Sequence, residues 1–393
     1  MTKFGLNSAS HRSLALISLT AVLATACDDD KGGAPAKAPP KPTAQRSYGE
    51  QPAAGAPAGP QVDPEAVLAM AKPMFSPLDA EAKDEKNPWT KEKADLGRML
   101  YYETRLSKNH DISCNTCHDL DNYGVDVREQ DGKRSKTSLG HKQQVGDRNS
   151  PTVYNAAFHL AQFWDGRAEN VEEQAKGPIL NPVEMAIADE ASAVATLKSM
   201  PGYVEAFKAA FPDDADAVTY DNMAKAIGAF ERKLVTPSKF DAFVAGDSSA
   251  LSAAEVHGLK TFMDVGCTQC HSGSLLGGIQ FQKLGSVKPW PNVEDEGRYA
   301  LTKSAPDKFV FKVPALRNIT ETGPYLHDGS VEDLSTMVKM MGEHQLAKGS
   351  LSDDETAAIV TFLGALTGEV DKGYIKKPEL PQSGPETPKP DAT

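Results

Sequence analysis

The stretches CNTCH at residues 114–118 and CTQCH at residues 267–271 decide how this chain is interpreted. A Cys-x-x-Cys-His unit in an exported chain is typical of covalent haem c attachment, because two thiols bind the haem and the adjacent histidine reaches its iron. A single unit of this kind could also be a redox or zinc-binding cysteine pair. Two units favour two haems, attached at the residues Cys114, Cys117 and His118, and Cys267, Cys270 and His271.

The sequence around the two units is repeated. An apolar helical stripe precedes each unit, at residues 90–100 and 251–262, and an amphipathic helix follows at the end of each half, near residues 223–234 and 352–366. Ser252 with Glu255 and Ser352 with Glu355 predict capping boxes, and Gly368 predicts the end of the last helix. Strand signals are weak. The sequence therefore predicts a mainly α fold of two c-type cytochrome domains, each with one covalently attached haem.

The first 62 residues have a different character. Lys3 and Arg12 precede an apolar run that ends before Cys27, which indicates a secretory signal peptide over residues 1–26. A Pro/Ala-rich segment over 27–62 predicts a tether. Cys27 lies where a lipoprotein box would place it, so we expect a periplasmic protein anchored by lipid. Ordinary cleavage near Ala26 is the alternative.

The expected domains then follow in order. A first haem domain spans residues 63–234, a second spans 235–366, and a C-terminal tail spans 367–393. The formal net charge of −12 argues against a general nucleic-acid binder, because no basic stripe is present to neutralise phosphates. For His110, His159, His257 and His344 we expect solvated or hydrogen-bonded side chains without a chemical role.

Seven further segments carry a resemblance to a known family. They lie at residues 96–100, 137–141, 148–152, 162–167, 174–178 taken together with 183–185, 313–318 and 322–329. In this order they resemble the bacterial di-haem cytochrome c peroxidases, over about residues 85–370. Residues 127–136 look like an insertion relative to that pattern.

The resemblance implies a role for individual residues. His118 would be the proximal ligand of a low-potential, peroxidatic haem and His141 its removable distal ligand. His271 and Met341 would hold a high-potential haem that receives electrons, with Met340 as the alternative to Met341. The remaining implied sites are Trp164 between the haems, Gln174 and Glu184 facing peroxide, and a calcium ion held by Asn149 and the carbonyl groups of Thr322 and Pro324.

The chemistry agrees with these assignments. Reduction of hydrogen peroxide to water requires a proton at the leaving oxygen, which a carboxyl such as Glu184 can deliver, while Gln174 can hold the oxygens by hydrogen bonds. Peroxide takes two electrons and a small cytochrome c or cupredoxin gives one at a time, which is a reason for two haems. The resemblance also implies a homodimer.

Three alternatives stay open. One is the methylamine-utilisation type of di-haem enzyme, which oxidises protein residues and carries tyrosine where this chain offers Met341. The others are a non-catalytic di-haem electron carrier and a peroxide sensor.

Overall fold

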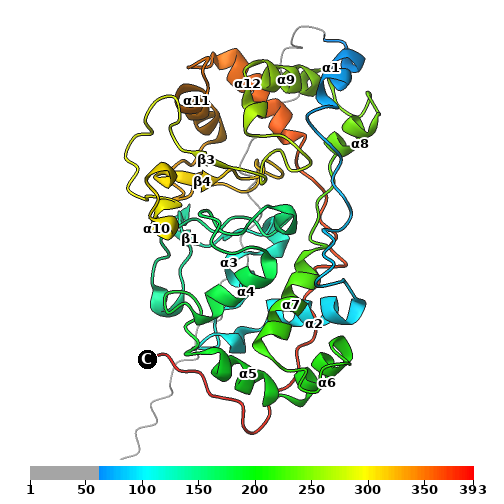
Figure 1. The fold of residues 1–393 in the computed structure, drawn as a ribbon, viewed down its shortest axis with the longest axis vertical. Helices are drawn as coiled ribbons and strands as arrows, with labels where there is room; N and C mark the ends of the chain where they lie inside the picture. Colours follow the sequence, from blue (N-terminus) through cyan, green and yellow to red (C-terminus); the bar gives the residue numbers. More distant parts are fainter. Residues whose placement is uncertain (1–61) are drawn as a thin grey trace, which may run out of the picture. The chain divides into compact units, whose positions relative to one another are not determined.

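The computed structural model describes residues 62–393. The predicted signal peptide, Cys27 and most of the predicted tether lie outside these residues. Within 62–393, no helix is both long and apolar enough to cross a bilayer. The prediction of a mainly α fold is confirmed, since the strands are no more than three residues long (Figure 1).

Helices form most of the first haem-motif half. Its elements are α2 (Lys91–Tyr101), α3 (Cys114–Cys117), β1 (Glu129–Gln130), β2 (Lys133–Arg134), α4 (Val171–Leu180), α5 (Glu190–Lys198), α6 (Pro201–Ala210) and α7 (Tyr220–Glu231). The pair β1–β2 is an antiparallel hairpin inside the expected insertion at residues 127–136.

The second half repeats this plan with fewer helices. Its elements are α8 (Lys239–Ala245), α9 (Ala253–Asp264), β3 (Phe281–Lys283), α10 (Tyr299–Thr302), β4 (Val310–Lys312), α11 (Leu334–Gln345) and α12 (Asp353–Gly364). Both predicted capping boxes are confirmed, at the starts of α9 and α12. The predicted stop at Gly368 is wrong, because α12 ends at Gly364.

An equivalent close helix crossing occurs in each half, and a glycine makes each of the two crossings possible. A Cβ atom on Gly97 of α2 would lie 1.9 Å from the carbonyl oxygen of Ala226 in α7. A Cβ atom on Gly258 of α9 would lie 2.1 Å from the carbonyl oxygen of Ala358 in α12. The backbones therefore approach closely at equivalent places, just before each Cys-x-x-Cys-His unit. This confirms the internal repeat at the level of packing.

Gly368 has a different role from the one expected. A Cβ atom on it would lie 2.1 Å from the carbonyl oxygen of Thr236, so it is small because two segments meet there. Thr236 is fully buried, and its hydroxyl accepts hydrogen bonds at 2.8 Å from the side-chain amides of both Asn155 and Asn318. Asn155 and Asn318 come from the two halves. One hydroxyl therefore joins equivalent turns of the repeat.

Each terminal segment of the described chain packs against the half that lies farther from it along the sequence. Helix α1 (Pro64–Ala71), which the sequence placed in the first haem domain, packs its Val67 and Leu68 in a core with α8, α9 and α12. The expected C-terminal tail returns to the first half, where Ile375 is buried beside Tyr102 and accepts its hydroxyl hydrogen bond at 2.6 Å. Burial of apolar surface explains both crossings, since each terminal segment covers the core of the opposite half.

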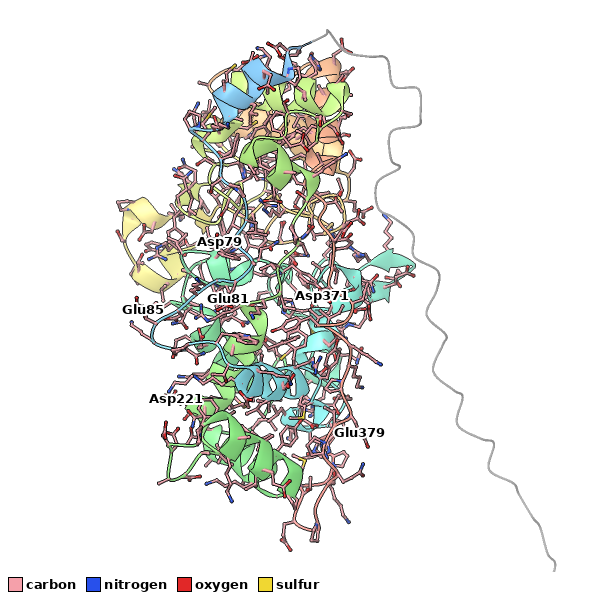
Figure 2. All side chains as sticks on the ribbon, turned by 90° about the vertical axis from the view of Figure 1, so that its right-hand side faces the viewer. Asp79, Glu81, Glu85, Asp221, Asp371 and Glu379 are labelled. Atoms are coloured by element: carbon pink, nitrogen blue, oxygen red, sulfur yellow. The ribbon has the colours of Figure 1, made fainter. Side chains whose placement is uncertain are left out.

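The two crossing segments share one face of the molecule. Figure 2 shows Asp79, Glu81 and Glu85 on the segment that follows α1, and Asp371 and Glu379 on the returning C-terminal segment. Of these carboxylates, Glu81 pairs with Lys233 at 3.4 Å, and Asp371 caps the turn at Gly373. Both connections between the halves thus carry carboxylates.

Candidate functional site

The first cysteine pair lies in a short helix in the first half. Ser113 and Thr116 form a capping box around α3, so the backbone at the motif is held by its own side chains. Cys114 packs against the cluster that contains Tyr101 and Phe230. All four motif cysteines are free thiols. Burial raises the pKa of Cys114 to about 12, so its thiol is protonated at neutral pH.

His141, the expected distal ligand, is buried, with 6% of its surface exposed. Its backbone N–H donates to the carbonyl oxygen of Glu184 at 2.7 Å. The preceding Gly140 has no room for a side chain, because a Cβ atom would lie 1.9 Å from the carbonyl oxygen of Val183. The ring Nε2 of His141 is buried and has no hydrogen-bond partner among residues 62–393. The structure thus brings His141 and Glu184 together and leaves an imidazole nitrogen available.

Glu184 is half-buried in the turn that follows α4. Asn181 donates to its Oε1 at 2.8 Å. Burial raises the pKa of this carboxyl, while Asn181 and the more distant Arg167 oppose the shift. A raised pKa favours the protonated form of the carboxyl, which is the form that can donate a proton. Gln174 lies on α4 and is half-buried, and its side chain has no hydrogen-bond partner within the described chain.

The second cysteine pair follows α9. The Nδ1 atom of His271 lies 2.9 Å from the carbonyl oxygen of Leu276, which orients the ring and leaves its Nε2 atom for a ligand bond. Phe262 packs at 6.5 Å from the His271 ring. Cys267 contacts the same core as Leu276, and burial raises the pKa of its thiol to about 12.

Met340 and Met341 are both half-buried on α11. Met340 lines an open cavity with Trp290 and Val331. Met341 follows Val338 by three residues and therefore lies near the same helix face. Val338 packs in the core that Cys267 and Leu276 contact, whereas Met340 and Met341 both pack against the cluster of Tyr325, Val331 and Met337. The preference for Met341 over Met340 therefore rests on the resemblance to the family.

Two loops of the same conformation meet where the halves touch. One loop is closed by a bridge between Gln162 and Ala168 and the other by a bridge between Tyr325 and Val331. Trp164 and His327 occupy equivalent positions in these loops, and their rings are edge-to-face at 6.4 Å. The Trp164 indole donates to the carbonyl oxygen of Asn149 at 2.9 Å. The structure thus places Trp164 at the contact between the halves.

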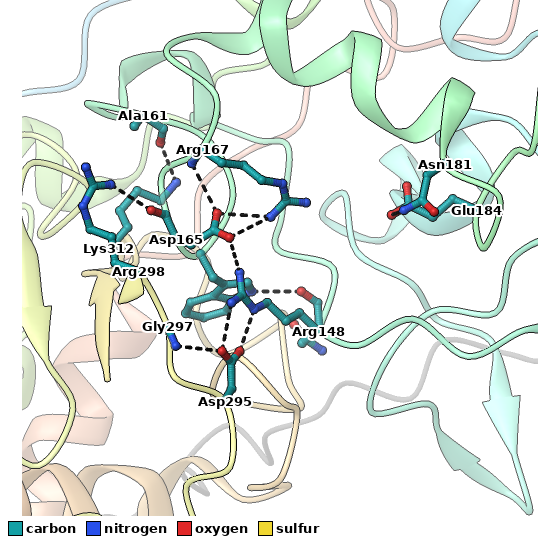
Figure 3. A network of polar contacts seen from close by, with 12 residues as sticks. Arg148, Ala161, Asp165, Arg167, Asn181, Glu184, Asp295, Gly297, Arg298 and Lys312 are labelled. Atoms are coloured by element: carbon teal, nitrogen blue, oxygen red, sulfur yellow. Dashed lines mark hydrogen bonds and ion pairs between the residues drawn. The ribbon is translucent and has the colours of Figure 1, made fainter. Parts of the chain in front are cut away.

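An ion-pair network surrounds this contact (Figure 3). Arg148 donates to Asp165 at 2.7 Å and binds both oxygens of Asp295 at 2.6 and 2.9 Å. These partners raise the pKa of Arg148 against the effect of its burial, and Arg148 in turn lowers that of Asp295. Arg298 donates to the carbonyl oxygen of Asp165 at 2.8 Å. The charges are thus paired and hold the Trp164 loop against the second half.

The residues expected to bind calcium lie near the β1–β2 hairpin. The Asn149 side-chain amide donates to the carbonyl oxygen of Lys136 at 2.9 Å. Arg134 donates to the carbonyl oxygens of Glu321 and Gly323 at 3.1 and 2.7 Å, in the turn that contains Thr322 and Pro324. Within residues 62–393, no group of three or more His, Cys, Asp or Glu side chains is arranged to hold a metal. Any cation in this turn would depend on carbonyl and amide oxygens.

Comparison with known proteins identifies the family. A family model described as di-haem cytochrome c peroxidase matches residues 91–249. Cytochrome c551 peroxidase of Pseudomonas aeruginosa is 43% identical over 340 residues, which cover 85% of this chain and 95% of the relative.

The chain belongs to the bacterial di-haem cytochrome c peroxidase family. Cytochrome c551 peroxidase of Nitrosomonas europaea is 46% identical over 304 residues, covering 77% of this chain and 87% of the relative. A crystal structure of a MauG-like protein associated with microbial copper homeostasis superposes with a TM-score of 0.65 at 26% identity, over 80% of this chain and 97% of that protein. The resemblance drawn from sequence segments is thereby confirmed.

The motif residues fit the two haems that the family name implies. Each motif offers two free thiols for thioether bonds and a histidine. His271 has its Nδ1 fixed by a carbonyl, as a metal-ligating imidazole requires, and His141 has an unpartnered nitrogen.

Sequence reasoning missed the network that joins the halves. Arg148 and Asp165 lie in segments that carried the resemblance, but Asp295 is 147 residues from Arg148 and has no motif around it. Reasoning from the sequence also passed over Lys312 and assigned no role to His159. A lysine in the otherwise apolar run from Phe309 to Val313 was the available signal.

Proposed function

We propose that this protein reduces hydrogen peroxide to water, using electrons from a small soluble redox protein such as a monohaem cytochrome c or a cupredoxin. The observation that carries the proposal is the joint placement of His141 and Glu184. The backbone N–H of His141 donates to the carbonyl oxygen of Glu184 at 2.7 Å, so an imidazole nitrogen without a hydrogen-bond partner among residues 62–393 and a buried carboxyl lie on two bonded segments. The names of the relatives support the same activity.

Two haems c bound to this chain would supply redox-active iron at the peroxide site and at the electron entry. Cys114, Cys117 and His118 would hold the first haem, and His141 would be its second, removable ligand. Cys267, Cys270, His271 and Met341 would hold the second.

Glu184 delivers the proton that the leaving oxygen of peroxide needs, and its burial, which raises the pKa of the carboxyl, favours the protonated form that can do so. Gln174 has an unpaired amide and orients the peroxide oxygens by hydrogen bonds. Trp164 fills the contact between the halves, where its indole is fixed by Asn149. Because His141 is bonded to the Glu184 turn, a movement of the histidine loop would also displace the proton donor.

We also propose, from the resemblance to the family, that Asn149 and the carbonyl groups of Thr322 and Pro324 bind a calcium ion. The hairpin residue Arg134 already places a positive charge on neighbouring carbonyls of this turn. Chelation is expected to slow activation if calcium is used, and Asn149→Ala should mimic it. Full activity of a calcium-free preparation would mean that activation does not require calcium and that the protein's own contacts hold this turn.

The assembly around the enzyme is also proposed. We place it in the periplasm as a homodimer, tethered through lipidated Cys27, with the predicted tether of residues 27–62 between the anchor and the folded part. Mass spectrometry of the mature N-terminus tests the lipid, and light scattering tests the dimer.

Peroxide consumption with a reduced donor cytochrome tests the activity. Glu184→Gln keeps the size and polarity of the side chain but removes its ionisable proton, so turnover should fall by about 10²–10⁴-fold. Glu173→Gln is the matched control. Glu173 is a half-exposed carboxylate on α4 and pairs with Lys176. Native turnover by Glu184→Gln, or none by the wild type, would contradict the proposal.

The wild-type assay also separates the alternatives. A non-catalytic electron carrier would take up donor electrons without consuming peroxide, and a sensor would bind peroxide without turnover. An enzyme of the methylamine-utilisation type would oxidise a protein substrate. The resemblance argues against that type, which carries tyrosine where this chain offers Met341.

A further inference from the structure

Lys312 is a buried lysine at the contact between the halves. It ends β4, and only 6% of its surface is exposed. Its Nζ atom lies 2.8 Å from Nδ1 of His159 and donates to the carbonyl oxygen of Ala161 at 2.9 Å. Lysine is rarely fully buried, because desolvation of an ammonium group is costly unless hydrogen bonds compensate it. A lysine in this place therefore calls for a functional explanation.

Lys312 and His159 cannot both be charged while they share a hydrogen bond. A hydrogen bond between two basic nitrogens needs one donor and one acceptor, so an ammonium group must face a neutral imidazole. His159 then carries its hydrogen on Nε2, which is buried and has no partner within the described chain. Burial lowers the pKa of Lys312 to about 7, and burial together with Lys312 keeps the pKa of His159 well below its usual value.

Other charged groups surround the pair. Asp165 attracts the Lys312 ammonium and opposes the effect of burial. That carboxylate is itself shared with Arg148 and Arg167, and Arg298 donates to its backbone carbonyl. The negative charge of Asp165 is therefore shared between Lys312 and two arginines.

Lys312 also forms hydrogen bonds to the loop that carries Trp164. Its backbone N–H donates to the carbonyl oxygen of Trp164 at 2.8 Å, while its side chain binds Ala161 three residues earlier. Lys312 belongs to the second half, and the loop from His159 to Trp164 belongs to the first. Figure 3 shows Lys312 reaching toward Ala161 beside Asp165. Of these two bonds from Lys312 to the loop, the one from the charged side chain is the stronger.

We propose that Lys312 and His159 form a one-proton pair that positions Trp164 between the haem-binding halves, and that the protonated pair is the form in which electrons pass rapidly from the second haem to the first. The inference rests on the proposed function. Lys312 is a positioning residue, because it touches neither peroxide nor the motif residues. Loss of its proton replaces a charge-assisted hydrogen bond with a weaker neutral one and loosens the loop.

The test measures electron transfer between the haems of the holo-protein after rapid injection of one electron, without peroxide. The wild-type rate should fall as the pH rises through about 7. Lys312→Met should be slower by about tenfold or more at pH 6, as expected for loss of a hydrogen bond to a charged group, and its rate should not depend on pH. Lys312→Arg stays charged and should retain the wild-type rate of pH 6 up to pH 9.

A second pair of variants covers the case in which Lys312→Met does not fold. His159→Asn keeps an acceptor for the ammonium group and should transfer electrons within about twofold of wild type, whereas His159→Leu should behave like Lys312→Met. A spectroscopic readout is independent of electron transfer. The indole hydrogen-bond signal of Trp164 in ultraviolet resonance Raman spectra, assigned with Trp164→Phe, should shift in the slow variants.

The outcomes separate this inference from the proposed function. Absence of inter-haem transfer in the wild type at every pH would overturn both. Transfer in the wild type with the same rate and pH profile in Lys312→Met or His159→Leu would overturn the one-proton pair alone.

Discussion

Gly97 and Gly258 offer a quantitative test of the internal repeat. A Cβ atom at either position would lie about 2 Å from a carbonyl oxygen of the crossing helix, at 1.9 Å for Gly97 and 2.1 Å for Gly258. Ordinary van der Waals contact begins at 3.4 Å, so the added carbon and the carbonyl oxygen would have to move apart by about 1.5 Å between α2 and α7 and by about 1.3 Å between α9 and α12. Overpacking of this kind typically costs about 1–3 kcal/mol.

The net effect of each substitution has two parts. Alanine in a helix is favoured over glycine by about 1 kcal/mol, which reduces the loss. Because the clash is with backbone, which cannot rotate away, we expect the upper end of the overpacking range. The predicted net loss in free energy of unfolding is about 2 kcal/mol for Gly97→Ala and for Gly258→Ala.

Urea unfolding of the holo-protein, followed by far-ultraviolet circular dichroism, measures the loss. Gly364→Ala is the matched control, because a Cβ atom on Gly364, at the end of α12, would meet nothing within 4 Å. It should leave stability unchanged or raise it by up to about 1 kcal/mol. A loss below about 0.5 kcal/mol for either crossing glycine would refute the reasoning that close helix contact requires it.

Three further predictions concern the haems and the titratable groups. Replacing Cys267 and Cys270 by Ala should leave one haem per chain in a pyridine haemochrome assay, and two surviving haems would exclude the second attachment site. His141→Gly should open the first haem to exogenous ligands such as cyanide while the second haem is still oxidised; unchanged ligand binding would assign the distal ligand elsewhere. The free energy of unfolding should rise with pH between about 7 and 10.5, because in this range a lysine of ordinary pKa in the unfolded chain binds a proton that buried Lys312 has lost. The gain in stability is complete above pH 10.5 and is lost as the pH falls to 7. It amounts to at most roughly 5 kcal/mol. Lys312→Met should remove that rise, and an unchanged pH profile in the variant would show that another group produces it.

Local signals in the sequence were sufficient for the mainly α fold and for the chemistry of the motifs. Each Cys-x-x-Cys-His unit is contiguous, and its preceding helix carries its own capping and apolar pattern. The capping boxes at Ser252 and Ser352 were predicted correctly because their hydrogen bonds join residues three apart. The stop at Gly368 was misplaced because that glycine is small for a tertiary reason, the approach of Thr236.

Only the tertiary structure decided which core each terminal segment joins and how the halves are held together. Helix α1 and the C-terminal segment cover cores that lie far away along the chain, and nothing in their own composition says which core is open. The contacts around Trp164, from Arg148 to Asp295 and from Lys312 to His159, join residues about 150 apart. Motif spacing reports the chemistry that a short segment can perform. The orientation of a histidine, the protonation of a buried lysine and the fit of two halves depend on burial and distance, which exist only after folding.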